Sequence, residues 1–461
     1  MASISKIRDS LQQQAWLFPF YGAAGLRVLR GRLLAGLTLT FLLLCCRTYA
    51  QEPLTLEKCI DIALRQSPTL AISQKQVNQA QGQYQTARAA LFPKVDATSY
   101  YNRLDPNRLN PIGALTTRPT LFSTESFAGL AGSQLLFDGG KTAALRRAAS
   151  WGVQVQQAGV RSSQADTVYG VTQAFSNLLV AKALIGVAQQ VRKQQQDFVS
   201  LTKAFYTAGK VTNLDVLTAE AQELGAEQNL EDAVQNQKVA AVLLQQAMGV
   251  QPQDGFDIAG ELPQTVAIPL PEEDLVNAAE RENPDIQKLR NQVRQAEETL
   301  RGSRRSYAPV ASLMGTYDYR EYNVGGHAFE YTAGVNVSIP VFDSGAIRGQ
   351  IKTARAVLEQ QHESLRAIDI QVKADVRQAM AAWQRAAANV RSGIQLVEAG
   401  HESVNTALGL YEAGKATSLD VLTAQSQLAL AQSSLLQTRG AYAIAKAQMV
   451  RLTGLRDVTT P

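Results

Sequence analysis

The chain contains an internal duplication, and this feature constrains its fold more than any other. Residues 206–219 and 411–424 share the pattern Tyr-x-Ala-Gly-Lys-x-Thr-x-Leu-Asp-Val-Leu-Thr-Ala at a spacing of 205 positions. The segments Leu-Phe-Asp-Gly-Gly at 136–140 and Val-Phe-Asp-Ser-Gly at 341–345 have the same spacing. Because chance similarity would not keep one spacing across separate landmarks, the chain consists of two copies of one structural unit.

Landmarks nearer the start of each copy are 216 positions apart. Arg-Gln-Ser-Pro at 65–68 corresponds to Arg-Glu-Asn-Pro at 281–284, and Pro93 corresponds to Pro309. The first copy therefore carries 11 additional residues between Pro93 and the second landmark. We expect a first repeat over 51–251, a Pro-rich linker over 252–271 and a second repeat over 272–461.

Proline is absent from two long parts of the chain, between Pro119 and Pro252 and between Pro340 and Pro461. Both parts are rich in Ala, Gln and Leu, which have high helix propensity. Uninterrupted helices here would extend about 100 Å, far longer than typical globular helices, so we expect them to pack as coiled coils. The expected helices are 141–206 and 212–250 in the first copy, and 346–411 and 417–453 in the second.

A helical turn is expected at each copy of the conserved pattern. Gly209 and Gly414 stand where a left-handed residue ends a helix. Three residues later, Thr212 and Thr417 begin Thr-x-Leu-Asp, which fits a capping box at the start of the next helix. Each copy therefore contains a long antiparallel helix pair.

Between the helices the hydrophobic period changes to two. Apolar and polar residues alternate over about 311–321 and 329–340, with aromatic residues at the ends, and less regularly over 94–104 and 126–137. Such segments are typical of transmembrane β-strands, although an amphipathic hairpin on a soluble core has the same alternation. Four strands cannot close a barrel in lipid, so a membrane location requires several chains: two would fill the barrel with side chains, and three would leave a pore.

The N-terminal segment is expected to be a signal peptide over 1–50, cleaved after Ala50. Arg27, Arg30 and Arg32 precede an apolar run over 33–46 that is short for a membrane-spanning helix. Lipidation at Cys45 or Cys46 is the alternative, and the length of the segment before Arg27 leaves the true start codon open.

Charge and composition exclude several classes of protein. Residues 1–50 contain six basic side chains and one acidic one, and the remainder has 39 of each, so its net charge of zero gives no indication of nucleic-acid binding. After the leader the chain has one cysteine, Cys59, and three histidines. These numbers argue against a disulfide framework and against a His-rich metal site. No long apolar segment is expected after the leader. We find no phosphate-binding loop or nucleophile elbow and expect neither an enzyme nor a cofactor.

The sequence resembles the TolC family of outer-membrane channel proteins of Gram-negative efflux and secretion systems over about 54–457. The resemblance rests on 54–64 followed by Ser67-Pro68, on 89–95, on 340–345 and on both copies of the tip pattern. It implies an α+β membrane protein and a homotrimer, with a twelve-stranded β-barrel in the outer membrane continued by a periplasmic α-helical barrel. It also implies docking to a periplasmic membrane-fusion adaptor, which links the channel to an inner-membrane pump of RND or ABC type.

The resemblance assigns adaptor contact to the two helical tips. The tip residues in this sequence are Gly209, Lys210, Val211, Thr212, Gly414, Lys415, Ala416 and Thr417. Lys210 and Lys415 stand where apolar or varied residues are common in the family, and they suggest an acidic adaptor tip. The same glycines and threonines would also be needed simply to form the turns.

Asp197 and Glu402 are the candidate gate residues. They are 205 positions apart, and each lies nine residues before the tyrosine of its tip. In a trimer they would place six carboxylates near the narrow end and favour cations. A solvated outer helix face is the alternative.

The main function expected is a passive exit duct for a pump. The competing hypothesis is a structural periplasmic coiled coil without a pore, which would leave the paired amphipathic hairpins unexplained. Drug efflux, metal-ion efflux and type I protein secretion all remain open, because the pump rather than the duct selects the cargo.

Overall fold

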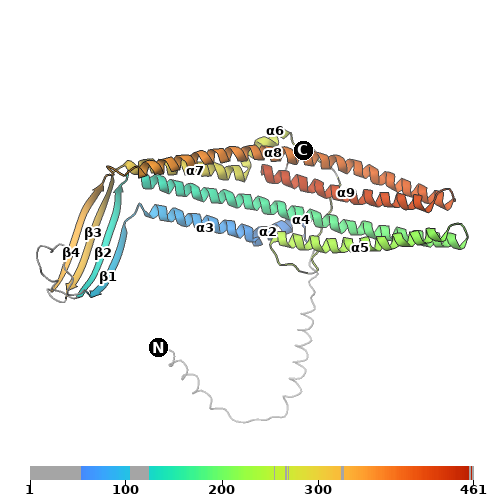
Figure 1. The fold of residues 1–461 in the computed structure, drawn as a ribbon, viewed down its shortest axis with the longest axis horizontal. Coiled ribbons are helices and arrows are strands. Elements are labelled where there is room, and N and C mark those ends of the chain that lie inside the picture. Colours follow the sequence, from blue (N-terminus) through green and yellow to red (C-terminus); the bar gives the residue numbers. More distant parts are fainter. Residues whose placement is uncertain are drawn as a thin grey trace, which may run out of the picture. The chain divides into compact units, whose positions relative to one another are not determined.

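The structure is a computed structural model that describes residues 53–103, 124–253, 255–264, 267, 269–322, 326–455 and 458. The expected signal peptide, with Cys45 and Cys46, lies outside these residues. Pro53–Pro461 forms one unit, shown in Figure 1.

Each copy has the same order of elements, two shorter helices, two strands and two long helices. The first copy contains α2 (Leu56–Gln66), α3 (Pro68–Ala89), β1 (Lys94–Arg103), β2 (Thr124–Phe137), α4 (Lys141–Thr207) and α5 (Asn213–Met248). The second contains α6 (Glu272–Glu282), α7 (Pro284–Arg304), η2 (Arg305–Tyr307), β3 (Val310–Tyr322), β4 (Gly326–Ser338), α8 (Ala346–Glu412) and α9 (Ser418–Thr453). The long helices and strands start and end within three residues of the limits expected from the sequence.

Beside α4, the helices α3 and α5 lie end to end, and α7 and α9 lie in the same way beside α8 (Figure 1). Both α3 and α5 pack on α4, and both α7 and α9 pack on α8. The end of α5 and the start of α3 meet closely, and we call this contact the joint. A β-carbon on Gly249, after α5, would lie 2.9 Å from Cδ of Pro68 and 3.0 Å from Cα of Ser67 at the start of α3. Gly454 meets Glu282 in the same way in the second copy. Glycine is needed at Gly249 for this approach and for its positive φ of 75°.

The four strands form one antiparallel sheet in the order β1-β2-β3-β4, which joins the two copies. Its register places apolar side chains on one face, as in the row Leu130, Tyr317 and Tyr331 across β2, β3 and β4. The other face carries charged side chains beside aromatic ones: Arg320 lies 5.3 Å from the ring of Phe127 and 3.9 Å from Glu330. Both outer strands, β1 and β4, are exposed along their whole length. The sheet therefore has two open edges.

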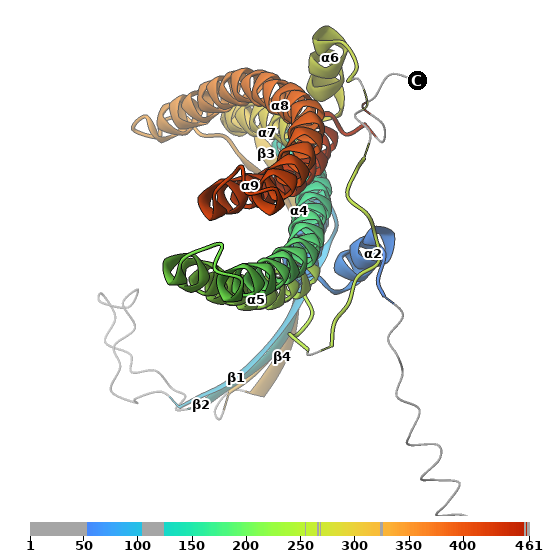
Figure 2. The same ribbon diagram turned by 90° about the vertical axis from the view of Figure 1, so that its right-hand side faces the viewer.

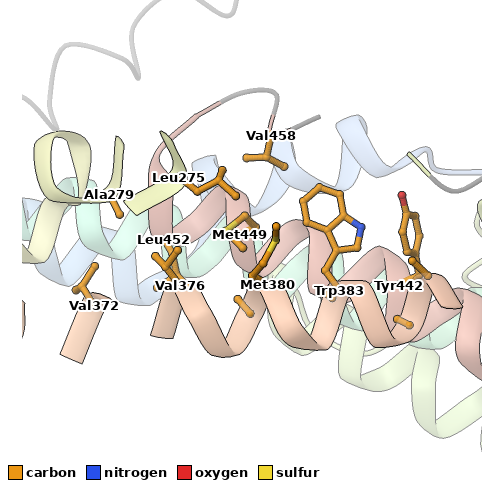
Figure 3. Packing of buried hydrophobic residues seen from close by; sticks show 14 of the residues in the cluster. Leu275, Ala279, Val372, Val376, Met380, Trp383, Tyr442, Met449, Leu452 and Val458 are labelled. Atoms are coloured by element: carbon orange, nitrogen blue, oxygen red, sulfur yellow. The ribbon is translucent and has the colours of Figure 1, made fainter. Parts of the chain in front are cut away.

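The hydrophobic cores of the two copies share equivalent positions on the first short helix and on both long helices, although the second core contains more buried residues. Figure 3 shows the second core, where Leu275 of α6, Trp383 of α8 and Met449 of α9 are fully buried. In the first core Cys59 occupies the position equivalent to Leu275. Burial raises the pKa of the Cys59 thiol to about 11, so this cysteine acts as a small apolar core residue.

Viewed from the helical tips, the long helices lie along an arc in the order α8, α9, α4, α5 (Figure 2). The two copies meet where α4 packs against α7 and α9 and where β2 pairs with β3. Among the described helices, α4 alone has a stretch long and apolar enough to cross a membrane by length and composition, and 22% of that stretch is buried. No such segment is expected from the sequence. Because α4 contacts α3, α5, α7 and α9, its apolar residues are needed on several sides.

Candidate functional site

Each helical hairpin ends in a tight turn with the same backbone hydrogen bonds. Gly209 has a φ of 73°, its N–H donates to Tyr206 O at 2.9 Å, and the Lys210 N–H donates to Phe205 O at 2.9 Å. This is a Schellman motif, in which the left-handed glycine ends the helix. Gly414 (φ 70°) and Lys415 repeat it in the second copy.

A capping box begins the helix after each turn, as the sequence predicts. Asp215 N–H donates to Oγ1 of Thr212 at 3.4 Å, while Oδ2 of Asp215 accepts from the Thr212 N–H at 2.9 Å. Asp420 and Thr417 form the same pair at 3.3 Å and 2.8 Å. Each box satisfies backbone donors that the first turn of a helix leaves without partners.

The two tips contact each other within one chain. The Ser418 hydroxyl at the start of α9 donates to Oδ1 of Asp215 at the start of α5, at 2.5 Å. This bond is the main reason that the pKa of Asp215 lies below its ordinary value, and the bonds from Thr212 lower it further. In Asp420 the bonds from Thr417 lower the pKa.

An aromatic cluster also joins the tips. The ring of Tyr411, at the end of α8, lies 5.4 Å from the ring of Phe198 and 5.5 Å from that of Phe205, both on α4. Tyr411 is 4% exposed, whereas the equivalent Tyr206 is 47% exposed. The duplication is therefore broken at the tips, because only the second tyrosine is buried between the two copies.

The tip residues chosen from the sequence lie at the end of the unit opposite the sheet (Figure 1). Gly209, Lys210 and Thr212 are exposed, as are Gly414, Lys415 and Thr417, while Val211 and Ala416 are half-buried against the aromatic cluster. The two lysines differ. Nζ of Lys210 lies 5.0 Å above the ring of Phe205, and Lys415 has no such ring contact among the described residues.

Both candidate gate residues are exposed. Asp197 precedes the buried Phe198 on α4, and Glu402 lies at the equivalent place on α8. Neither carboxylate takes part in an ion pair within the described part of the chain. The neighbouring acids are different, since Glu220 is paired with Lys203 at 2.7 Å and Glu227 with Arg192 at 3.4 Å.

The contact between the tips is not evident from the sequence. Asp215 and Tyr411 belong to the repeated pattern, but their counterparts Asp420 and Tyr206 make no equivalent contact within the described part of the chain. Phe198 does not belong to any repeated pattern, because its counterpart in the second copy is Ser403. Across the described residues there is no cluster of three His, Cys, Asp or Glu side chains arranged to hold a metal ion.

The comparison with protein families decides what kind of protein carries this architecture. A model of the outer membrane efflux protein family matches residues 59–250 and 275–455, one segment in each copy. The chain belongs to this family.

Known relatives and solved structures agree with this assignment. The efflux protein is 23% identical to outer membrane efflux protein BepC of Brucella suis biovar 1 over 343 residues, which cover 73% of this chain and 74% of BepC. It is 23% identical over 274 residues to the proteases secretion protein PrtF of Dickeya chrysanthemi, covering 58% and 59%. The fold matches the outer membrane protein VceC of Vibrio cholerae with a TM-score of 0.73 at 18% identity, covering 87% of this chain and 96% of VceC.

The family and the fold confirm the resemblance stated from the sequence. The efflux protein is an outer-membrane channel protein of the efflux and type I secretion class in Gram-negative bacteria, with its helices extending into the periplasm. Family members and neighbours are channel proteins rather than enzymes.

Proposed function

We propose that three copies of the chain form one exit duct, with twelve strands closed into a barrel in the outer membrane. The observation that carries this proposal is the four-stranded sheet with an apolar face and two open edges. Unpaired edges are not tolerated in lipid, so β4 of one copy must pair with β1 of the next. Three copies give twelve strands and leave room for a water-filled lumen.

Reconstitution tests the duct directly. The purified protein should migrate as heat-modifiable trimers and produce stepwise conductance in a planar bilayer. Soluble periplasmic monomers without conductance would favour the competing coiled-coil hypothesis and would overturn the duct.

We propose that both tips contact a periplasmic adaptor, which connects the duct to an inner-membrane pump. Support comes from the exposure of Lys210 and Lys415 at the end opposite the sheet, where two like charges would match an acidic partner surface. Cysteines at Lys210 and Lys415 should capture the adaptor on cross-linking in cells. Cysteine at Lys75, exposed on α3, is the matched control, and equal capture from Lys75 would contradict the assignment.

We propose Asp197 and Glu402 as a carboxylate ring near the narrow end of the lumen. Their exposure and the lack of ion-pair partners within the described chain leave both charges free to act on passing ions. Replacing both by Ala should reduce cation selectivity in single-channel recordings. Unchanged selectivity would place both side chains on the outer surface instead.

We propose that the duct is divided into a leader over 1–50, repeats over 51–251 and 272–461 and a linker over 252–271. The two segments matched by the family support the two repeats. The pump, rather than the duct, selects the transported substrate. Accordingly, relatives serve different uses: BepC is named as an efflux protein and PrtF as a protein for protease secretion.

A further inference from the structure

One row of side chains crosses three strands of the sheet on the face that carries charged residues. The register places Tyr100 of β1 beside Phe127 of β2, and Phe127 beside Arg320 of β3. Because side chains alternate between the two faces of a strand, all three lie opposite the apolar row described above. We call these three residues the collar. The collar lies near the end of the sheet farthest from the helices, since β3 leaves the helices at Val310 and ends at Tyr322 (Figure 1).

The collar residues contact one another in the order of their strands. The rings of Tyr100 and Phe127 are stacked, with centroids 4.7 Å apart and 14° between their planes. The Arg320 guanidinium lies 5.3 Å from the centre of the Phe127 ring, within the range of a cation–π interaction. The Tyr100 hydroxyl donates to Oε1 of Glu125 at 3.4 Å. Phe127 is therefore held between a ring and a cation, and the three side chains form one continuous surface.

Gly129 lets the Phe127 ring lie against its own strand. A β-carbon at Gly129, two residues farther along β2 on the same face, would lie 2.7 Å from Cζ of Phe127 and would also collide with Oδ1 of Asp318. A larger residue there would therefore displace the ring or the carboxylate. The position of the ring is thus fixed by the strand beneath it as well as by its two neighbours in the collar.

Between the collar and the helices, the same face carries mostly smaller side chains. The next three rows across the strands contain Thr98, Gly129, Asp318 and Glu330; then Asp96, Ala131, Thr316 and Thr332; then Lys94, Ser133, Met314 and Gly334. In none of these rows do three adjacent strands all carry a large side chain, as they do in the collar. A lumen enclosed by this face would therefore be narrower at the collar than nearer the helices.

Arg320 gives the collar a positive charge in a fixed position. Its ion pair with Glu330 is long, at 3.9 Å, whereas Lys94, the other basic residue on this face in the described strands, lies 2.8 Å from Asp96. The guanidinium also contacts the Phe127 ring, which restricts its position. The Arg320 side chain is 35% exposed, so a solute at this face can reach it. A guanidinium keeps its charge at every physiological pH.

We propose that the collar is a constriction at the outer end of the duct, which limits solutes by size and, through Arg320, favours anions over cations. This inference rests on the proposed trimer, in which the apolar face contacts lipid and the charged face lines the lumen. Symmetry would then place three copies of the collar at one height in the barrel. The collar adds a control point on the strands, separate from the carboxylates proposed near the helical tips.

A thiol placed in the row of the collar tests the charge in the assembled, full-length protein. Ala328 on β4 is exposed and lies beside Arg320 on the same face, so Ala328→Cys reports the local potential. Its reaction rates with a sulfonate-bearing and a trimethylammonium-bearing methanethiosulfonate give a ratio. Arg320→Gln should lower this ratio about threefold at low salt, and the change should shrink in about 1 M salt.

Two further variants control the charge test. Arg320→Lys keeps the charge and should preserve the ratio of rates at position 328. Arg103→Gln is the matched control, because it removes a cation from the opposite face at the same end of the sheet, and it should change the ratio little. A ratio that Arg103→Gln lowers as much as Arg320→Gln does would contradict the assignment of the charge to the collar.

Thiols on the two sides of the collar test the constriction. Met314→Cys lies nearer the helices on the charged face, and Asn102→Cys lies nearer the outer end. On intact cells that carry the protein, the largest polyethylene-glycol maleimide that modifies position 314 should be smaller than the largest that modifies position 102. Phe127→Ala should raise the limit at 314 and leave the limit at 102 unchanged. Tyr101→Ala, on the opposite face of β1, is the matched control and should change neither limit.

The outcomes separate the collar from the proposed trimer. Trimers in which Arg320→Gln leaves the ratio of rates unchanged, or in which the size limits at 314 and 102 are equal, would overturn the collar and leave the duct intact. Absence of trimers in the otherwise unmodified protein would overturn the duct itself. If Arg320→Gln does not assemble, Arg320→Met, which keeps an unbranched stem beside Phe127, replaces it, and an unchanged ratio there also contradicts the inference. Buried Cys59 contributes little background.

Discussion

Tyr411 shows how one side chain distinguishes two copies that are otherwise alike. Its ring lies between Phe198 and Phe205, whereas the equivalent Tyr206 remains exposed on a single chain. Its hydroxyl is buried and has no hydrogen-bond partner among the residues that the structure describes. The ring therefore stabilises the contact between the tips, and the hydroxyl does not contribute.

Replacing Tyr411 by Ala should destabilise the tips by about 3 kcal/mol, because a large buried aromatic side chain is lost. Hydrogen exchange of the tip amides should accelerate by about 100-fold. Tyr411→Phe is the matched control and should leave exchange unchanged or slower, since it removes only an unpaired buried hydroxyl. Equal acceleration in both variants would show that the hydroxyl has a partner.

The bond from Ser418 determines the titration of Asp215. The pKa of Asp215 lies below its ordinary value of 3.8, so its carboxylate stabilises the folded tip fully above pH 3.8 and loses this effect as the pH falls through the lower, folded value. Ser418→Ala should raise the pKa of Asp215 and move the loss of tip structure to higher pH. Carboxyl NMR of labelled Asp can measure this, with Asp420, which is held by Thr417, as internal control. An unchanged Asp215 would contradict the assignment.

At the scale of the elements, the joint between α5 and α3 depends on Gly249. Gly249→Ala should destabilise the assembled protein by at least about 1 kcal/mol, because alanine is strained at a φ of 75° and its Cβ would meet Ser67 and Pro68. Thermal dissociation of the proposed trimer can measure this. Gly82→Ala in α3 meets no atom within 4 Å and should instead stabilise slightly, through helix propensity. Equal effects of the two variants would argue against a close joint.

The long helices and strands could be predicted because their signals are local and repeated. The absence of proline predicts how far the long helices extend. The alternation of apolar and polar residues predicts the strands β3 and β4. Helices α2, α3, α6 and α7 were not predicted: Ser67-Pro68 and Asn283-Pro284 served only as landmarks, although proline in each is the first residue of a helix. Asn283 even accepts hydrogen bonds from the N–H groups of Asp285 and Ile286.

The contact between the tips could not be predicted from the repeat. A duplication treats the copies as equivalent, whereas Phe198 and Ser403 occupy the same position with different chemistry. Asp215 and Ser418 are 203 positions apart, and the pattern gives no signal that they meet. Identifying such a contact requires knowing which faces of the two hairpins are in contact.

At the scale of the whole molecule, the open edge of β4 gives a test of assembly. Backbone N–H groups of consecutive strand residues point to opposite sides, so one of Gly334 and Val335 donates toward β3 and the other toward the edge. If the edge pairs with another copy, Pro at either position should abolish heat-modifiable trimers. Trimers that survive with Pro at one of the two positions would indicate a free edge.

The end-to-end arrangement of α3 and α5 beside α4 has a mechanical consequence. Helix α5 stops midway, at Gly249, whereas α4 continues from the tip to the strand β2, and α8 continues from its tip toward β4 in the same way. Among the described elements, α4 and α8 are therefore the two continuous helices through which a twist or a pull at the tips reaches the sheet. A change in the direction of α5 at Gly249 or of α9 at Gly454 would therefore displace the periplasmic end without a direct helical connection from that helix to the strands.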